Sequence, residues 1–128
     1  MKHRLAAEID WVDAPAEDFT GTVKFGPLSQ DGALDALAVR FEPGARTDWH
    51  WHPEGQVLYV TEGVGLVQDD DGTTVEISAG DTVFTPANQV HWHGAGPSAP
   101  MAHLSFTTGG STVWEQRKVT DEEYHSRG

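Results

Sequence analysis

The sequence contains no cysteine among its 128 residues, so it has neither a disulfide nor a thiolate to offer to a metal ion or a substrate. Any metal site or reactive side chain must therefore use nitrogen and oxygen atoms. Basic residues are also scarce, since 8 Lys and Arg stand against 20 Asp and Glu and the formal net charge is −12. A nucleic-acid partner, which requires a basic face, is not expected.

Long apolar runs are missing as well. Residues 1–10 include basic side chains but no apolar run of the length found in a signal peptide, and no later segment has the length and hydrophobicity to span a membrane. We therefore expect a cytoplasmic protein without a membrane partner. The length fits one domain, which buries about two thirds of the surface of its extended chain.

Short alternating segments take the place of long helical patterns. In residues 34–41, Leu37, Val39 and Phe41 share one face, which we expect to point inward, so that Leu37 and Val39 are candidates for a pocket wall. Strands separated by frequent turns are typical of an all-β sandwich or barrel. Further strands are expected at residues 57–60, 66–68, 73–77 and 101–107, with a turn at 63–65 and a hairpin at 70–72.

The two ends of the chain differ from this central part. Residues 1–27 lack a helical period and are expected to form an arm or edge strands, which favours a homodimer or homotetramer. Residues 28–113 would form the barrel and 114–128 a C-terminal segment. A capping box at residues 120–123 predicts a short helix reaching Arg127, packed on the barrel by Trp114 and Val119.

Histidines in the middle of the chain are candidate metal ligands. His50 and His52 are two residues apart, so on one strand their side chains would share a face. Gln56 keeps the same parity, although Pro53 and Gly55 predict a kink or turn before it. One face would then carry two imidazoles and an amide oxygen.

A second histidine pair follows about forty residues later in the chain. His91 and His93 again share a face, and on the expected strand 101–107 the side chains of His103 and Thr107 share one too. Parity directs His93 and His103 toward the cavity. They are candidate general bases, because the ordinary pKa of histidine suits proton transfer near neutrality; the alternative is that each only hydrogen-bonds a neighbouring ligand or strand.

The two histidine stretches together resemble the paired motifs of the cupin superfamily. They have the form G-x5-H-x-H-x3-Q-x6-G and G-x5-P-x-N-x2-H. The resemblance implies a single-domain, jelly-roll type antiparallel β-barrel that holds one divalent metal ion. The implied ligands are His50, His52, Gln56 and His91. Asn88 stands where the family has Gly, and Asn tolerates the left-handed backbone conformation better than most residues.

Gln56 also departs from the family, which usually has glutamate. A neutral amide leaves the charge of a divalent ion uncompensated, so the ion is a stronger Lewis acid. In flavonol-cleaving dioxygenase cupins the glutamate often takes a proton, so Gln56 argues against that activity. Ligand type does not select the metal by affinity alone; we expect Mn(II), with Fe(II) as the second choice.

A narrower resemblance is to small bacterial manganese cupins that act as hydroxynitrile lyases. It rests on residues 41–47, the four implied ligands, residues 91–95, His103, Trp114 and residues 119–124. It implies that His93 and His103 line a pocket in which cyanohydrins are cleaved to aldehyde and cyanide, or formed from them. That family has a glutamine at the Thr107 position and can have a smaller alanine at the Leu37 position, so the resemblance implies that these two residues change substrate fit and rate.

Two other functions remain open at this point. One is a metal-dependent dioxygenase, decarboxylase or isomerase acting on a small hydroxy- or keto-acid. The other is a cupin that binds a small molecule without turning it over. A cupin barrel hosts many chemistries, so the fold does not choose among them.

Overall fold

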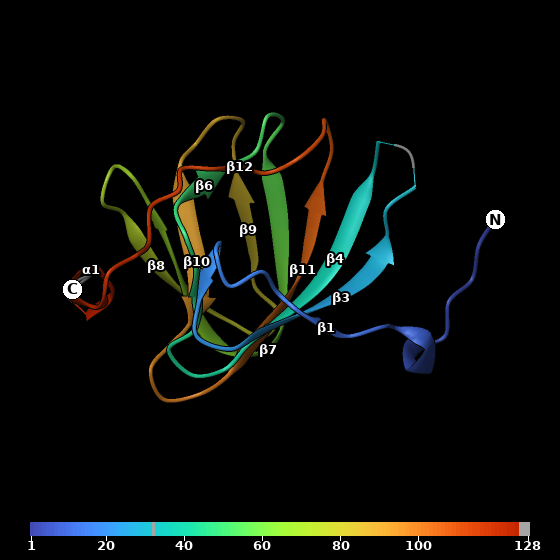
Figure 1. Ribbon diagram of the computed structural model, residues 1–128, viewed down its shortest axis with the longest axis horizontal. Helices are drawn as coiled ribbons and strands as arrows, with labels where there is room; N and C mark the ends of the chain where they lie inside the picture. Colours follow the sequence, from blue (N-terminus) through green and yellow to red (C-terminus); the bar gives the residue numbers. More distant parts are fainter. Residues whose placement is uncertain (32, 126–128) are drawn as a thin grey trace.

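The computed structural model describes residues 1–31 and 33–125, and it is an antiparallel β-structure with one short helix near the C-terminus (Figure 1). A single 3₁₀ turn, η1 (Ala6–Glu8), precedes the strands, and the helix is α1 (Asp121–His125). The strands are β1 (Val12–Asp13), β2 (Phe19–Thr20), β3 (Val23–Ser29), β4 (Asp35–Phe41), β5 (Arg46–Thr47), β6 (His50–Trp51), β7 (Gln56–Asp69), β8 (Thr74–Ser78), β9 (Thr82–Thr85), β10 (His91–Ala95), β11 (Met101–Thr107) and β12 (Val113–Trp114).

The strands form a curled sheet in the order β1-β3-β4-β11-β7-β10-β5-β2, with β8 and β9 paired to β7 and β12 paired to β6. Figure 1 shows β3, β4 and β11 on one side of the molecule and β6, β8 and β10 on the other, with the inner faces turned toward each other. The predicted all-β barrel is confirmed. The expected strands at 34–41 and 101–107 correspond to β4 and β11.

Strand β7 links the two sides of the barrel, and here one prediction was wrong. We expected a turn at residues 63–65, but β7 continues through them for 14 residues. Its first part pairs with β9 and β11, its second part with β8 and β10. Gly63, with φ of 76°, provides the bend, and a Cβ there would clash with the carbonyl oxygen of Pro100. The glycine therefore marks a bent strand in place of a turn.

Part of the barrel interior is an apolar core. Alternation on β4 and β7 turns Phe41, Leu58 and Val60 inward, and all three are fully buried. Met101 at the start of β11 joins them. Cross-strand pairing of such side chains fixes the register of the sheet, because a slip of one residue would turn them to solvent.

The N-terminal part contributes more to the barrel than an arm would. Strand β3 pairs with β4 along most of its length, so the expected boundary after residue 27 falls inside a barrel strand. Strand β2 pairs with β5 at the opposite end of the sheet, and buried Phe19 packs against Phe25 and Trp114. The N-terminal segment thereby reaches both sides of the cavity.

The C-terminal helix begins at the predicted capping box. Thr120 Oγ1 accepts a hydrogen bond from the Glu123 amide at 3.1 Å, and the Thr120 amide donates to Glu123 Oε1 at 3.0 Å. Tyr124 on the helix donates to the Ala95 carbonyl oxygen at 2.6 Å. The helix extends to His125, and the predicted end at Arg127 lies outside the described residues.

Packing of this helix was predicted correctly for one residue and wrongly for another. Val119 and Tyr124 form a buried cluster with Trp92, and Arg46 donates to the Val119 carbonyl oxygen at 2.7 Å. Trp114, however, lies on the other side of the barrel wall, where its ring is 4.8 Å from that of His50. It belongs to β12, whose pairing with β6 turns the indole toward the cavity.

Apolar side chains also lie on the outer face of the sheet. Phe84, Val57 and Phe106 occupy one register row across β9, β7 and β11, and their exposed fractions are 68%, 40% and 37%. We call these three residues the outer patch. Separately, none of the helical segments within residues 1–31 and 33–125 has the length and hydrophobicity of a membrane span.

Candidate active site

The short strand β6 positions the first candidate ligand. His50 pairs directly with His91 of β10, and the two rings are 4.3 Å apart between centroids. The strand ends at Trp51, so His50 and His52 do not lie on one strand as we expected. The Gly55 amide donates to the His52 carbonyl oxygen, closing the expected turn, and Gln56 then begins β7.

Backbone carbonyls fix the tautomers of His50 and His91. Nδ1 of His50 is 2.9 Å from the Asp48 carbonyl oxygen, and Nδ1 of His91 is 2.9 Å from that of Gln89. A carbonyl oxygen only accepts, so each Nδ1 carries the hydrogen. In the neutral imidazoles each Nε2 then has a free lone pair, as a metal ligand requires.

The contact between Gln56 and His91 is informative because two acceptors face each other. Gln56 Nε2 donates to Ser105 Oγ at 2.8 Å, which leaves its Oε1 3.1 Å from Nε2 of His91. With the amide in this orientation neither atom has a hydrogen to donate, an arrangement that a cation beside the pair would satisfy. Two ligands at a right angle on an ion with bonds of about 2.1 Å stand about 3 Å apart. The observed separation fits a shared metal ion.

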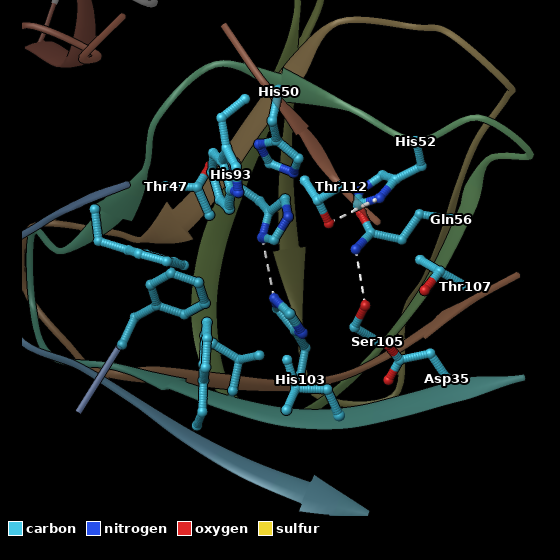
Figure 2. A pocket seen from close by; sticks show the side chains of 16 residues that line it. Asp35, Thr47, His50, His52, Gln56, His93, His103, Ser105, Thr107 and Thr112 are labelled. Carbon is cyan, nitrogen blue, oxygen red and sulfur yellow. Dashed lines mark hydrogen bonds between the residues drawn. The ribbon is translucent and has the colours of Figure 1, made fainter. Parts of the chain in front are cut away.

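His52 completes the set of four predicted ligands. Its Nδ1 is 3.3 Å from Thr112 Oγ1, whereas its Nε2 is buried and has no hydrogen-bond partner among the described residues. Its ring lies 5.1 Å from that of His50 and 5.5 Å from that of His91. The contacts of His91 with His50, His52 and Gln56 thus bring all four residues together in one region of the barrel, and Figure 2 shows His50, His52 and Gln56 there.

The tightest group of nitrogen donors differs from the predicted set in one member. Among the described His, Asp and Glu side chains, His50, His91 and His93 each place a ligand atom within 4.8 Å of the others. His93 thus stands beside the candidate ligands, where the role predicted for it was that of a general base and not of a ligand. The ligand role of His52 remains a prediction, and the donor set as a whole fits a divalent metal ion.

His93 and His103 form a hydrogen-bonded pair on the inner side of the cavity. His103 Nε2 lies 3.0 Å from His93 Nδ1, as the dashed line in Figure 2 marks. The outer nitrogens, Nε2 of His93 and Nδ1 of His103, are buried without hydrogen-bond partners in the described chain. Phe41 packs against both rings. The pair is therefore held in place and keeps polar atoms available.

Burial keeps these histidines neutral. Removal from water lowers the pKa of His52 from 6.5 to about 4 and that of His103 to about 3. Burial also lowers the pKa of His91. It lowers the pKa values of His50 and His93 well below the ordinary value, and repulsion from neighbouring histidines lowers these two further. Each neutral ring offers one lone pair, to a metal ion or to a proton.

His50, His52, His93 and His103 line a cavity of about 80 Å³, which has room for a small organic molecule. The three predicted pocket residues, Leu37, Val39 and Thr107, all lie in its wall. Aromatic and polar side chains make up the rest of it. The remaining wall residues are Phe19, Phe25, Phe41, Trp114, Asp35, Thr47, Ser105, Thr112, His50, His52, Gln56, His93 and His103.

Several of these wall residues were not identified from the sequence. Ser105 lies on the same face of its strand as His103, and Asp35 lies on the same face as Leu37. Strand alternation could therefore have identified both as wall residues. Phe19 and Trp114 come from segments far away in the chain that only tertiary pairing brings to the cavity. No local pattern identifies such residues.

The fold and the histidine-lined cavity define this chain as a member of the cupin family, and the cupin domain family matches residues 37–107, more than half of the chain. Among curated proteins it is similar to an (R)-mandelonitrile lyase of Granulicella tundricola. The two are 50% identical over 115 residues, which covers 86% of this chain and 88% of the relative.

Solved structures show the same fold. A cupin-like protein from Thermotoga maritima superposes with a TM-score of 0.86 at 38% identity, and the match covers 90% of this chain and 91% of that one. The polyketide cyclase RemF from Streptomyces resistomycificus matches with a TM-score of 0.78 over 98% of this chain and 91% of that one. At 19% identity the latter likeness concerns the fold alone.

Proposed function

We propose that this chain is a metal-dependent hydroxynitrile lyase, which cleaves cyanohydrins into an aldehyde and hydrogen cyanide or catalyses the reverse addition. The observation that carries the proposal is the His93–His103 pair standing in one cavity beside the candidate ligands. The similarity to a curated mandelonitrile lyase supports the same reaction.

The ligands that we propose for the metal ion are His50, His52, Gln56 and His91, and the proposed ion is Mn(II) or Fe(II). Their neutral donors leave the charge of the ion uncompensated. A divalent ion held by these residues would act as a Lewis acid, which makes a substrate hydroxyl lose its proton more readily. The buried surroundings strengthen that effect, because little water screens the charge.

His93 is the proposed base. It lies between the candidate ligands and His103, with ring centroids 5.2 Å from His50 and 4.8 Å from His103. To accept a proton at Nε2, His93 must carry its hydrogen on Nδ1 and donate it to Nε2 of His103. His103 then acts by fixing this tautomer and by stabilising the imidazolium that forms on His93.

The proton that the substrate loses stays within the pocket, because His93 first accepts it and later donates it. His93 takes the hydroxyl proton, the carbon–carbon bond to the nitrile breaks, and its electron pair leaves with cyanide while the carbonyl forms. The imidazolium of His93 then protonates cyanide to hydrogen cyanide and returns to its neutral state. Burial alone disfavours the positively charged imidazolium. The negative charge that develops on the departing cyanide stabilises it.

The first experiment measures benzaldehyde release from mandelonitrile at mildly acidic pH, where the spontaneous reaction is slow. Manganese-loaded protein is compared with metal-free protein and with His52→Ala, and His3→Ala serves as the matched control because His3 is exposed and remote from the cavity. We expect release that depends on the metal, is lost in His52→Ala and is unchanged in His3→Ala.

A different result would replace this proposal. If the manganese-loaded protein releases no benzaldehyde, lyase activity is excluded for this substrate. Oxygen uptake by the iron-loaded form with a small hydroxy- or keto-acid would then establish the oxygenase alternative. Tight binding of a small molecule without any turnover would establish a binding protein. The cytoplasmic location and the homodimer or homotetramer stay predictions alongside the proposed activity.

A further inference from the structure

Asp35 occupies the polar end of the cavity and has no role in the reaction described above. It is the first residue of β4 and pairs in register with Thr107 of β11, which pairs in turn with Gln56 of β7. All three line the cavity, so they form one row across neighbouring strands. Figure 2 shows Asp35 beside Ser105 and Thr107, on the far side of the view from His93.

One oxygen of this side chain lacks a partner. Oδ1 of Asp35 is buried, and no described residue donates a hydrogen bond to it. A buried acceptor without a donor costs free energy. A hydrogen-bond donor on a bound ligand would remove that cost for an oxygen in a binding pocket. The neighbouring Ser105 hydroxyl accepts from Gln56 at 2.8 Å and does not form a hydrogen bond with this oxygen.

The remaining walls indicate what kind of molecule brings that donor. Phe19, Phe25, Phe41 and Trp114 supply aromatic surface to the wall of the same cavity, and Phe41 packs against both rings of the histidine pair. Flat aromatic rings pack favourably against such edges and faces. When the reacting carbon of an aromatic substrate lies at His93, the far edge of its ring points toward a more distant part of the cavity wall. Asp35 lies in the wall at a distance from His93.

We propose that Asp35 is a specificity residue that accepts a hydrogen bond from a hydroxyl group on the aromatic ring of the substrate. The preferred substrates are then ring-hydroxylated aromatic cyanohydrins and the corresponding hydroxybenzaldehydes. This inference rests on the proposed lyase function for its substrate class. A site built to bond a hydroxyl discriminates strongly against analogues without one, because its buried acceptor is then left unpaired.

The kinetic test compares mandelonitrile with its 3-hydroxy and 4-hydroxy derivatives on manganese-loaded protein. We expect kcat/KM to be at least about tenfold higher for one of the hydroxylated substrates, mainly through a lower KM, since the contact is remote from the reacting carbon. Asp35→Ala is expected to abolish this preference and Asp35→Asn to reduce it. Asp71→Ala, at the exposed hairpin tip, is the matched control.

A binding measurement separates this inference from the lyase proposal. Calorimetric titration with 3-hydroxybenzyl alcohol, 4-hydroxybenzyl alcohol and benzyl alcohol requires no turnover. Tighter binding of a hydroxylated alcohol that is lost in Asp35→Ala upholds the inference even if no cyanohydrin is cleaved. Lyase activity without any preference for ring hydroxyls, or a preference unchanged in a folded Asp35→Ala variant, overturns the inference and leaves the lyase proposal intact.

Discussion

Nδ1 of His93 lies 3.0 Å from Nε2 of His103, so the two buried imidazoles share one hydrogen between them. Only when that hydrogen resides on His93 does its Nε2 have a lone pair to accept a proton. The position of one hydrogen therefore decides whether the pocket contains a base. This relationship makes His93 the most informative residue to change.

Replacing His93 with alanine is expected to lower the rate of mandelonitrile cleavage by about 10²- to 10⁴-fold, the usual contribution of a positioned base. Bound manganese, measured by elemental analysis of dialysed protein, is expected to remain at one ion per chain. In His52→Ala we expect the metal itself to be lost. The opposite result, with metal lost in His93→Ala and kept in His52→Ala, would make His93 the third imidazole ligand, in line with its closeness to His50 and His91.

Replacing Gln56 with glutamate adds a negative charge to the ligand set. We expect manganese to bind at least about tenfold more tightly, because a carboxylate attracts the ion more strongly than an amide does. The lyase rate is expected to fall, since the ion becomes a weaker Lewis acid. Metal titration and steady-state kinetics measure both effects. Gln30→Glu makes the same charge change at an exposed position and is expected to alter neither.

Replacing Leu37 with alanine enlarges the cavity at the expected position of the aromatic ring of the substrate. We expect kcat/KM for mandelonitrile to rise severalfold, and the free energy of unfolding to fall by about 2 kcal/mol because packed methyl groups are removed. Leu34 is 60% exposed, so Leu34→Ala is the matched control and should change neither quantity appreciably. A rate unaltered by Leu37→Ala would mean that this side chain does not limit substrate fit.

The pH dependence of stability follows from the lowered histidine pKa values. The pKa of His52 falls to about 4 and that of His103 to about 3, chiefly through burial, against 6.5 in the unfolded chain. Their neutral forms favour the folded state above about pH 6.5, and this stabilisation is lost as the pH falls toward the folded pKa values. Urea unfolding of metal-free protein is expected to show a loss of several kcal/mol between about pH 7 and pH 4.

His103→Gln provides the check on that assignment. The variant removes one group whose protonation opposes folding in acid, so its stability is expected to fall less steeply with decreasing pH than that of the parent protein. Equal slopes for the two proteins would show that His103 does not contribute.

The outer patch is the place where we expect two copies of the chain to meet. Apolar side chains exposed together on a sheet face mark association surfaces, and Phe84 is the most exposed of the three. Light scattering is expected to show a dimer or tetramer, and Phe84→Glu to shift it toward the monomer. Val75→Glu places the same charge on exposed β8 and is expected to leave the mass unchanged. A monomeric parent protein would refute the oligomer prediction.

Much of the barrel was predictable because it obeys short-range rules. Alternation fixed the inward faces of β4 and β11, and the capping box fixed the start of α1. Asn88 indeed has a positive φ of 67°, as its place in the motif required. These features depend on neighbours within a few positions in the chain, which a sequence displays directly.

The errors have a common physical origin in tertiary pairing. Two glycines around Val64 indicated a turn, yet pairing of Gly63 with β11 and of the following residues with β8 and β10 holds this segment in a bent strand. His52 falls outside a strand because the sheet partners of His50 end there. The indole of Trp114 turns to the cavity for the same kind of reason. Such outcomes depend on which strands meet, and spacing alone does not reveal that.

The pocket wall is assembled from both ends of the described chain, with Phe19 contributed from β2 and Trp114 from β12. On a ribosome the four candidate ligands emerge well before Trp114 does. A nascent chain at that stage has its histidines but an unfinished hydrophobic enclosure around them. A metal ion bound then would be in contact with water, so under the proposed function the finished protein, and not the growing chain, is the species equipped to select an ion and a substrate.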